Sequence, residues 1–116
     1  MTIDAVRDRS KTVTRRHVDT WQTLKAGDRL TLIEKGMGLP KGAQQVVLAE
    51  VEIVSVTVEP LAFIRSEPNA TKREGLGHLT PSHFAAFWLN GHGYKSVAHL
   101  GPLSWPMCRR IEWRYL

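Results

Sequence analysis

The segment from Val46 to Val58 constrains the fold more than any other part of the sequence, because it is long and rich in valine. Branched side chains of this kind favour extended strands, and they predict one long strand here. The alternation of apolar residues that leads to Ile53 changes phase at Val54. This change predicts a bulge that curves a small sheet into a barrel; a strand that is buried uniformly is the alternative.

Shorter segments on either side predict two further strands. Residues 28–35 follow a Gly-Asp turn and predict one of them. In the last segment, 111–116, apolar and polar residues alternate. Its inner face would carry Ile111, Trp113 and Tyr115. We expect this final strand to close the sheet.

Two helices are predicted after the long strand. The first spans residues 60–66 and starts with a proline, which the first turn of a helix tolerates. The second starts at Thr80, a capping residue that precedes Pro81, and ends before Asn90. One face of this helix carries three aromatic residues: Phe84, Phe87 and Trp88. We expect this face to pack into the core.

These elements predict an α+β fold, a small mixed β-barrel flanked by two or three short helices. A chain of 116 residues suits one hydrophobic core, so we expect a single domain over residues 1–116. The lone cysteine, Cys108, excludes an internal disulfide. The longest apolar run, Phe84–Leu89, is far shorter than the roughly 20 residues of a membrane helix. The N-terminus has no apolar signal segment, and we expect a cytoplasmic protein without a membrane partner.

The net charge of +5 is concentrated at the two ends of the sequence. Residues 1–16 hold five basic and two acidic side chains, and residues 109–116 hold three basic and one acidic. The residues between them carry equal numbers of both signs. If the two ends adjoin, this excess forms one basic patch that suits a polyanion; on opposite faces it serves solubility alone.

The densest polar cluster is Lys11-Thr-Val-Thr-Arg-Arg16. A solvated loop or an edge strand is its simplest interpretation. In a catalytic interpretation, the neighbouring arginines lower the pKa of Lys11, and the neutral amine acts as a general base towards the hydroxyl of Thr14. In a third interpretation, Arg15 and Arg16 bind a phosphate or carboxylate as bidentate forks.

This basic block resembles the first motif of the ASCH domains, a branch of the PUA-like superfamily. Its Lys-Thr-x-Thr-Arg-Arg form is the variety typical of short phage and bacterial proteins. Other segments resemble further family blocks in the same order: Gly27-Asp28, residues 58–64, Arg73–Leu76, Phe84–Trp88 and Ile111–Trp113. The resemblance runs from about Arg9 to the C-terminus and is fairly specific when the blocks are taken together.

The resemblance implies a small PUA-like β-barrel flanked by helices, with a cleft for a nucleotide or base. Many PUA-like domains bind RNA or recognise modified bases, so the expected partner is RNA, a nucleotide or a modified nucleoside. One bacterial branch is an amidohydrolase that deacetylates N4-acetylcytidine with a lysine, a threonine and a glutamate. These three correspond to Lys11, Thr14 and Glu74 in this chain.

The resemblance also implies roles for individual residues. In a hydrolase, Thr14 would be the nucleophile, Lys11 the general base, and Glu74 would orient Lys11 or return a proton. Arg16 or backbone N–H groups would hold the developing oxyanion. In a binding domain, basic and aromatic side chains would contact the ligand: Arg15, Arg16, Trp21 and Arg73.

Two departures from the enzyme branch favour binding over hydrolysis. Arg9-Ser10 stands where that branch has Gly-Arg before the lysine, and Arg15 stands where it has an apolar residue. A second arginine suits an anionic ligand better than a neutral nucleoside. We therefore expect a nucleic-acid or nucleotide-binding domain, with hydrolysis of N4-acetylcytidine-type amides as the alternative.

No metal or other cofactor is expected. The histidines are five: His17, His78, His83, His92 and His99. Their spacings match no zinc site, and the lone cysteine offers no second thiolate.

Overall fold

The computed structural model describes residues 3–34, 46–94 and 101–116. Its elements in chain order are α1 (Ile3–Arg7), β1 (Val13–Arg16), β2 (Arg29–Ile33), β3 (Val47–Pro60), the 3-10 helix η1 (Leu61–Arg65), α2 (Ala70–Arg73), α3 (Pro81–Gly91), the 3-10 helix η3 (Pro102–Ser104) and β4 (Met107–Tyr115). The fold is α+β, as the sequence predicts. Within the described ranges, no helix has the length and apolarity needed to cross a lipid bilayer.

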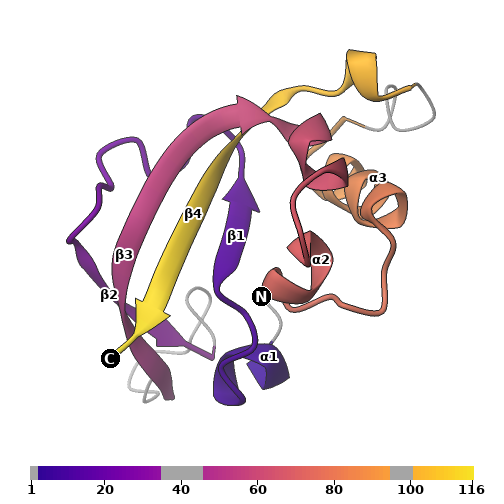
Figure 1. The fold of residues 1–116 in the computed structure, drawn as a ribbon. Coiled ribbons are helices and arrows are strands. Elements are labelled where there is room, and N and C mark those ends of the chain that lie inside the picture. Colours follow the sequence, from indigo (N-terminus) through magenta and orange to yellow (C-terminus); the bar gives the residue numbers. More distant parts are fainter. Residues whose placement is uncertain (1–2, 35–45, 95–100) are drawn as a thin grey trace.

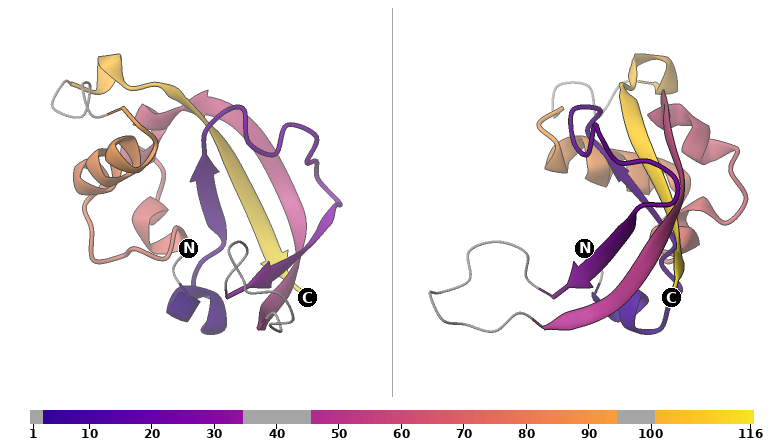
Figure 2. Two further views of the ribbon diagram at one scale, coloured as in Figure 1. Left: turned by 180° about the vertical axis from the view of Figure 1, so that it is seen from behind. Right: turned by 90° about the vertical axis from the view of Figure 1, so that its left-hand side faces the viewer.

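The described strands form an open, four-stranded antiparallel sheet in the order β1-β4-β3-β2 (Figure 1). Its curvature is clearest in β3, which arches alongside β4 (Figure 2). The edge strands β1 and β2 do not pair with each other in the described part of the chain, and every described pairing is antiparallel. Closure of the sheet into a mixed barrel therefore stays a prediction.

Strand β3 contains the bulge that its change of apolar phase predicts. Its pairing with β4 shifts between Ile53 and Ser55. Val51 and Ile53 are buried before the shift, whereas Val54 within it is 45% exposed. The alternative of a uniformly buried strand is therefore wrong.

The other two predicted strands are present with different bounds. Strand β2 lies within the predicted range 28–35, whose last residue is outside the described part of the chain. Strand β4 begins at Met107, earlier than predicted, because its pairing with β3 continues back to Pro60. The inward positions of Ile111 and Trp113 are confirmed, since both are buried.

The two predicted helices are also present. The first is the 3-10 helix η1, and the second, α3, starts as predicted: the Thr80 side chain accepts a hydrogen bond from the His83 N–H at 3.2 Å. Helix α3 continues to Gly91, two residues beyond the expected end. Phe84 is buried, but Phe87 is 64% exposed, so the prediction that Phe87 packs into the core is wrong.

Helices α1 and α2 are not predicted by the sequence pattern. Each is about one turn long, and helices this short depend on tertiary contacts rather than on their own propensity. Helix α1 is held by its buried Ala5 and Val6. Helix α2 follows Asn69, whose backbone is left-handed with a φ of 56°.

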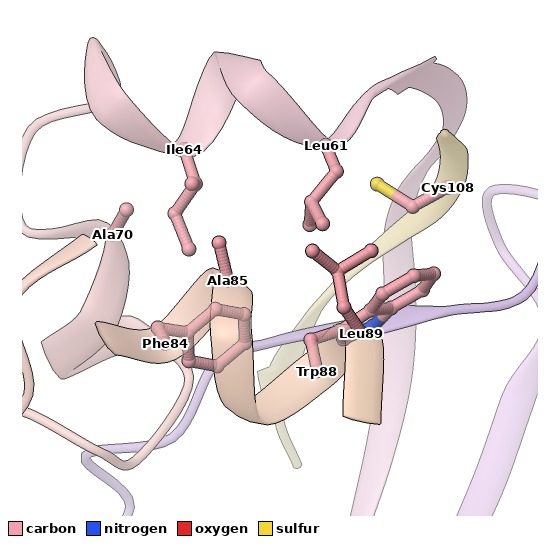
Figure 3. Packing of buried hydrophobic residues seen from close by; sticks show 8 residues of the cluster. All are labelled: Leu61, Ile64, Ala70, Phe84, Ala85, Trp88, Leu89 and Cys108. Carbon is pink, nitrogen blue, oxygen red and sulfur yellow. The ribbon is translucent and has the colours of Figure 1, made fainter. Parts of the chain in front are cut away.

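Buried apolar side chains form two clusters. The sheet core consists of Val6, Leu32, Val51, Ile53, Ile111 and Trp113. The helical core consists of Leu61, Ile64, Ala70, Phe84, Ala85, Trp88, Leu89 and Cys108, from η1, α2, α3 and β4 (Figure 3). The helical core fixes α3 against the sheet, and Figure 1 shows that α3 then lies on the side of β1.

Candidate functional site

A pocket of about 120 Å³ lies between the edge strand β1 and helix α3. Its walls are formed by Lys11, Thr14, Arg15, Arg16, Glu74, Leu76, Phe84, Phe87, Trp88, Gly91 and His92. The structure thus brings Lys11, Thr14 and Glu74 to one pocket, although Glu74 is 63 positions from Lys11 in the sequence.

The backbone of β1 forms one wall of this pocket. Because β1 is an edge strand, only one of its sides pairs with β4. On the other side, Lys11 Nζ donates to the carbonyl of Val13 at 3.0 Å, and Trp88 Nε1 donates to the carbonyl of Arg15 at 2.8 Å. Side chains thus satisfy carbonyls that a further strand would otherwise take. The basic block is both an edge strand and part of the pocket.

The amine of Lys11 is buried, and only 4% of the residue is exposed. Its Nζ donates to the carbonyls of Val13 and Glu74, the latter at 2.7 Å, and lies 3.7 Å from Glu74 Oε1. Burial lowers the pKa of Lys11 below 10.5; the Glu74 carboxylate opposes this shift, whereas the charges of Arg16 and Arg15 reinforce it. The lysine is therefore easier to deprotonate than an exposed one.

Glu74 lies at the end of the single turn α2 and contacts two basic residues of the pocket with two different groups. Its carbonyl accepts from Lys11 while its side chain reaches Arg15, whose Nη1 donates to Oε2 at 2.8 Å. Burial raises the pKa of Glu74 above 4.5, and Lys11 and Arg15 act in the opposite direction. The residue ties the turn after α2 to the start of β1.

Thr14 and Arg16 lie on one face of β1, opposite the buried Val13 and Arg15, because side chains alternate along a strand. Both are partly buried and line the pocket. The Nε of Arg16 is buried and has no hydrogen-bond partner among the described residues. This unused donor suits an anionic or carbonyl oxygen of a ligand.

Arg15 has a different environment from the one that a ligand clamp requires. Its side chain is completely buried, and its two terminal nitrogens are bound by carboxylates of the protein: Nη1 by Glu74 at 2.8 Å and Nη2 by Glu67 at 2.9 Å. Both terminal nitrogens of the guanidinium are therefore already bound within the protein. Arg15 thus lines the pocket while its terminal nitrogens are held by carboxylates of the protein.

The ion pairs around Arg15 extend into one connected network. It contains four cations and three carboxylates: Lys11, Arg15, Arg73, Arg110, Glu67, Glu74 and Glu112. Arginine does not deprotonate in proteins, so Lys11 is the cation of this network that can lose a proton. A neutral Lys11 would leave three arginines against three carboxylates, which agrees with its lowered pKa.

Helix α3 adds an aromatic wall. The rings of Trp88 and His92 stack with centroids 4.0 Å apart, and His92 Nδ1 lies 2.8 Å from the carbonyl of Trp88. Because a carbonyl can only accept, Nδ1 carries the proton in neutral His92, and Nε2 is left as an acceptor. His92 is not among the residues that the sequence motifs select as site residues. Its position four residues after Trp88 is the signal that places both on one helix face.

Two of the predicted ligand-binding residues do not line the pocket. Trp21 lies in the segment between β1 and β2 and is 49% exposed. Arg73 binds Glu112 at 2.8 Å and donates to the Thr12 hydroxyl at 3.3 Å. Arg73 is adjacent to Glu74 and belongs to the supporting network, whereas Trp21 lies apart from it.

The described residues contain no group of three histidine, cysteine or acidic side chains that could hold a metal ion. His17 is partly buried, and its ring lies near Asp19 and parallel to that of Tyr94. His99 lies outside the described part of the chain.

Comparisons with known proteins extend the description of the fold. No protein family model matches the sequence, and no curated protein matches it. The chain is similar in structure to the protein EF3133 from Enterococcus faecalis V583, whose crystal structure is assigned to the family DUF984. The TM-score is 0.65 and the sequence identity 15%, and the alignment covers 99% of this chain and 69% of that protein. At this identity, the likeness establishes a shared α+β fold.

Proposed function

We propose that this chain is an ASCH-type domain that binds one base of RNA, of a nucleotide or of a modified nucleoside in the pocket between β1 and α3. The observation that carries the proposal is the combination of Arg16, whose Nε has no partner among the described residues, with the aromatic wall of Trp88 and His92. Aromatic faces stack on bases, and an arginine beside them binds phosphate or carbonyl oxygens.

The size of the pocket indicates that the part of a ligand inside it is no larger than a base. Pockets that enclose whole drug-sized ligands have volumes of roughly 300–1,000 Å³. The pocket beside β1 has about 120 Å³. It therefore suits a single ring system, while the remainder of a nucleotide would lie outside it. Phe87, which is 64% exposed and lines the pocket, is available at its rim.

The pairing of the arginines supports the same conclusion. The two basic ends of the sequence adjoin, with Arg15 opposite Arg110 and Arg16 opposite Arg109 in neighbouring strands. However, Arg15 and Arg110 both bind Glu67, and Arg109 donates to a backbone carbonyl. These three cations are already engaged, so a pocket for one base agrees better with the structure than an open basic groove along RNA.

Calorimetric titration with nucleoside monophosphates tests the binding function. We expect Arg16→Ala to weaken binding by about tenfold or more, because a hydrogen bond to a charged group contributes about 1.5–3 kcal/mol. Arg65→Ala removes the same charge from an exposed position at the end of η1 and should leave the affinity unchanged. Equal affinities for the wild type and Arg16→Ala, or no binding of any nucleotide at low salt, would contradict the proposal.

A second candidate function is hydrolysis of an N4-acylated cytidine in the same pocket. The observation that favours it is the burial of Lys11, whose pKa is lowered, in a pocket that also contains Thr14 and Glu74. A neutral amine activates a hydroxyl nucleophile when the two groups come within hydrogen-bond reach, and a shared pocket is the first requirement for this.

In this reaction the Thr14 oxygen bonds to the acyl carbon while Lys11 Nζ takes the hydroxyl proton. The C–N bond then breaks, and the amine of cytidine leaves with the proton from Lys11. Water attacks the acyl-threonine ester, Lys11 receives its proton, and the carboxylic acid departs as Thr14 recovers its hydroxyl. Arg16 or an outward backbone N–H of β1 would hold the oxyanion in both steps.

Release of acetate from N4-acetylcytidine measures this activity. We expect Thr14→Ala to reduce the rate by about 10³-fold or more, because the nucleophile is removed. Thr31→Ala, which removes an exposed hydroxyl from β2, should have the wild-type rate. If the wild type releases no acetate, or if Thr14→Ala keeps the activity, then the hydrolytic function is wrong for this substrate.

A further inference from the structure

Glu67 is the point at which the ion-pair network converges, although it does not line the pocket. It lies in the turn between η1 and α2, and 16% of its side chain is exposed. Its Oε1 accepts from Arg15 Nη2 at 2.9 Å and from Arg110 Nε at 2.6 Å, and its Oε2 is 3.8 Å from Arg73 Nη1. One carboxylate thus contacts three arginines from three different elements, β1, α2 and β4.

The contact with Arg15 connects Glu67 to the pocket. The guanidinium is planar, and its donors have fixed directions. One terminal nitrogen binds Glu67 and the other binds Glu74, so the position of the group is fixed from both sides. The other oxygen of Glu74 lies 3.7 Å from Lys11 Nζ. Glu67, Arg15, Glu74 and Lys11 therefore form a chain of alternating charge that ends in the pocket.

We infer that Glu67 is a positioning residue for this pocket: it holds Arg15 against Glu74 and thereby keeps the Glu74 carboxylate directed at Lys11. Its importance to the activity rests on the proposed function of the pocket. Without Glu67, the second nitrogen of Arg15 has no carboxylate opposite it, and the guanidinium can bind Glu74 with both nitrogens. Glu74 would then be drawn from Lys11.

The titration of Lys11 Nζ, followed by NMR of isotope-labelled lysine, reports this effect directly. The charged groups that face Lys11 are Glu74 from the turn after α2 and Arg15 and Arg16 from β1; α3 adds His92 to the same pocket. Glu67→Gln keeps the size of the side chain and removes its charge. We expect Lys11 to titrate at a pH lower by about half a unit or more. Arg15 then lacks one of its two counter-charges and binds Glu74 with both terminal nitrogens, which draws the Glu74 carboxylate away from Lys11.

Glu112→Gln is the matched control. Glu112 also binds Arg110 and Arg73, at 3.0 and 2.8 Å, but it has no described contact with Arg15. The control removes the same charge from the same network, and we expect it to shift the Lys11 titration far less than Glu67→Gln does. A Lys11 titration unchanged in Glu67→Gln, or shifted equally in both variants, would overturn the inference.

Glu67→Asp provides a second variant in case Glu67→Gln does not fold. The aspartate keeps the charge but is shorter by one methylene, and it cannot reach Arg15 and Arg110 together without movement. We expect a smaller shift of the Lys11 titration in the same direction, and an unchanged titration would overturn the inference. The proposed function is tested separately: if no nucleoside or nucleotide binds the wild type, that function fails, while the Lys11 titration still decides the role of Glu67.

Discussion

Lys11 occupies a position that accepts both of its protonation states. A neutral amine has two N–H donors and one lone pair, and the carbonyls of Val13 and Glu74 match the two donors. A charged amine has a third donor, which the Glu74 carboxylate faces at 3.7 Å. The two carbonyls therefore hold the amine in place in either state. A group that takes and returns a proton during a reaction benefits from such a site.

The stability of the protein should depend on the protonation of Lys11. Because its pKa is lower in the folded state than 10.5, the unfolded chain binds the proton more strongly. The free energy of unfolding should therefore rise with pH between the lowered pKa and about 10.5. Lys11→Met should lose this rise, as measured by urea unfolding at a series of pH values. Lys25→Met removes an exposed lysine and should keep it. An identical pH dependence in wild type and Lys11→Met would show that Lys11 titrates normally.

The sequence identifies several of these residues but not their partners. Lys11, Thr14 and Glu74 are selected by motif, and all three line the pocket. The carboxylates that bind Arg15 lie 59 and 52 positions away in the sequence, and no local pattern shows that they converge on it. For that reason the sequence predicts Arg15 as a ligand contact, while the structure places it in buried ion pairs.

The elements with strong local signals are predicted well. The bulge of β3 follows from its change of apolar phase, and the start of α3 follows from Thr80 and Pro81. The docking of α3 beside β1 has no such signal, because it depends on the helical core and on one hydrogen bond from Trp88 to the backbone of Arg15. The pocket exists only through this docking.

The Trp88 hydrogen bond is the part of this docking that a single substitution removes. Trp88→Phe keeps an aromatic ring in the core but leaves the Arg15 carbonyl without its donor. We expect a loss of about 1–3 kcal/mol in the free energy of unfolding, measured by urea denaturation. Trp21→Phe, at an exposed site, should change it by less than about 0.5 kcal/mol. Equal stability of Trp88→Phe and wild type would mean that apolar packing alone docks the helix.

At the scale of the whole molecule, the structure changes the meaning of the net charge of +5. The two basic ends of the sequence lie in neighbouring strands, β1 and β4. Two of the glutamates that neutralise them come from elsewhere in the sequence: Glu67 and Glu74 belong to the segments around α2, whereas Glu112 lies in β4 itself. Part of the excess positive charge is thus neutralised by ion pairs that join the segments around α2 to the sheet. Composition records the excess, but only the fold shows how many of these cations are paired.

The ion pairs of Glu112 with Arg73 and Arg110 should make the free energy of unfolding fall at acidic pH. Burial alone would raise the pKa of Glu112, but hydrogen bonds from Arg110 and Arg73 outweigh burial and lower it below 4.5. Its stabilising contribution is therefore complete above pH 4.5 and is lost as the pH falls through the lowered pKa. Burial of Glu74 acts oppositely, because a raised pKa favours the folded state as the pH falls towards 4.5. We expect urea unfolding of Glu112→Gln to show a weaker loss of stability in acid than the wild type, measured below pH 4.5. If both proteins lose stability with the same slope, then Glu112 does not link the helices to the sheet through its charge, and the acid sensitivity has another origin.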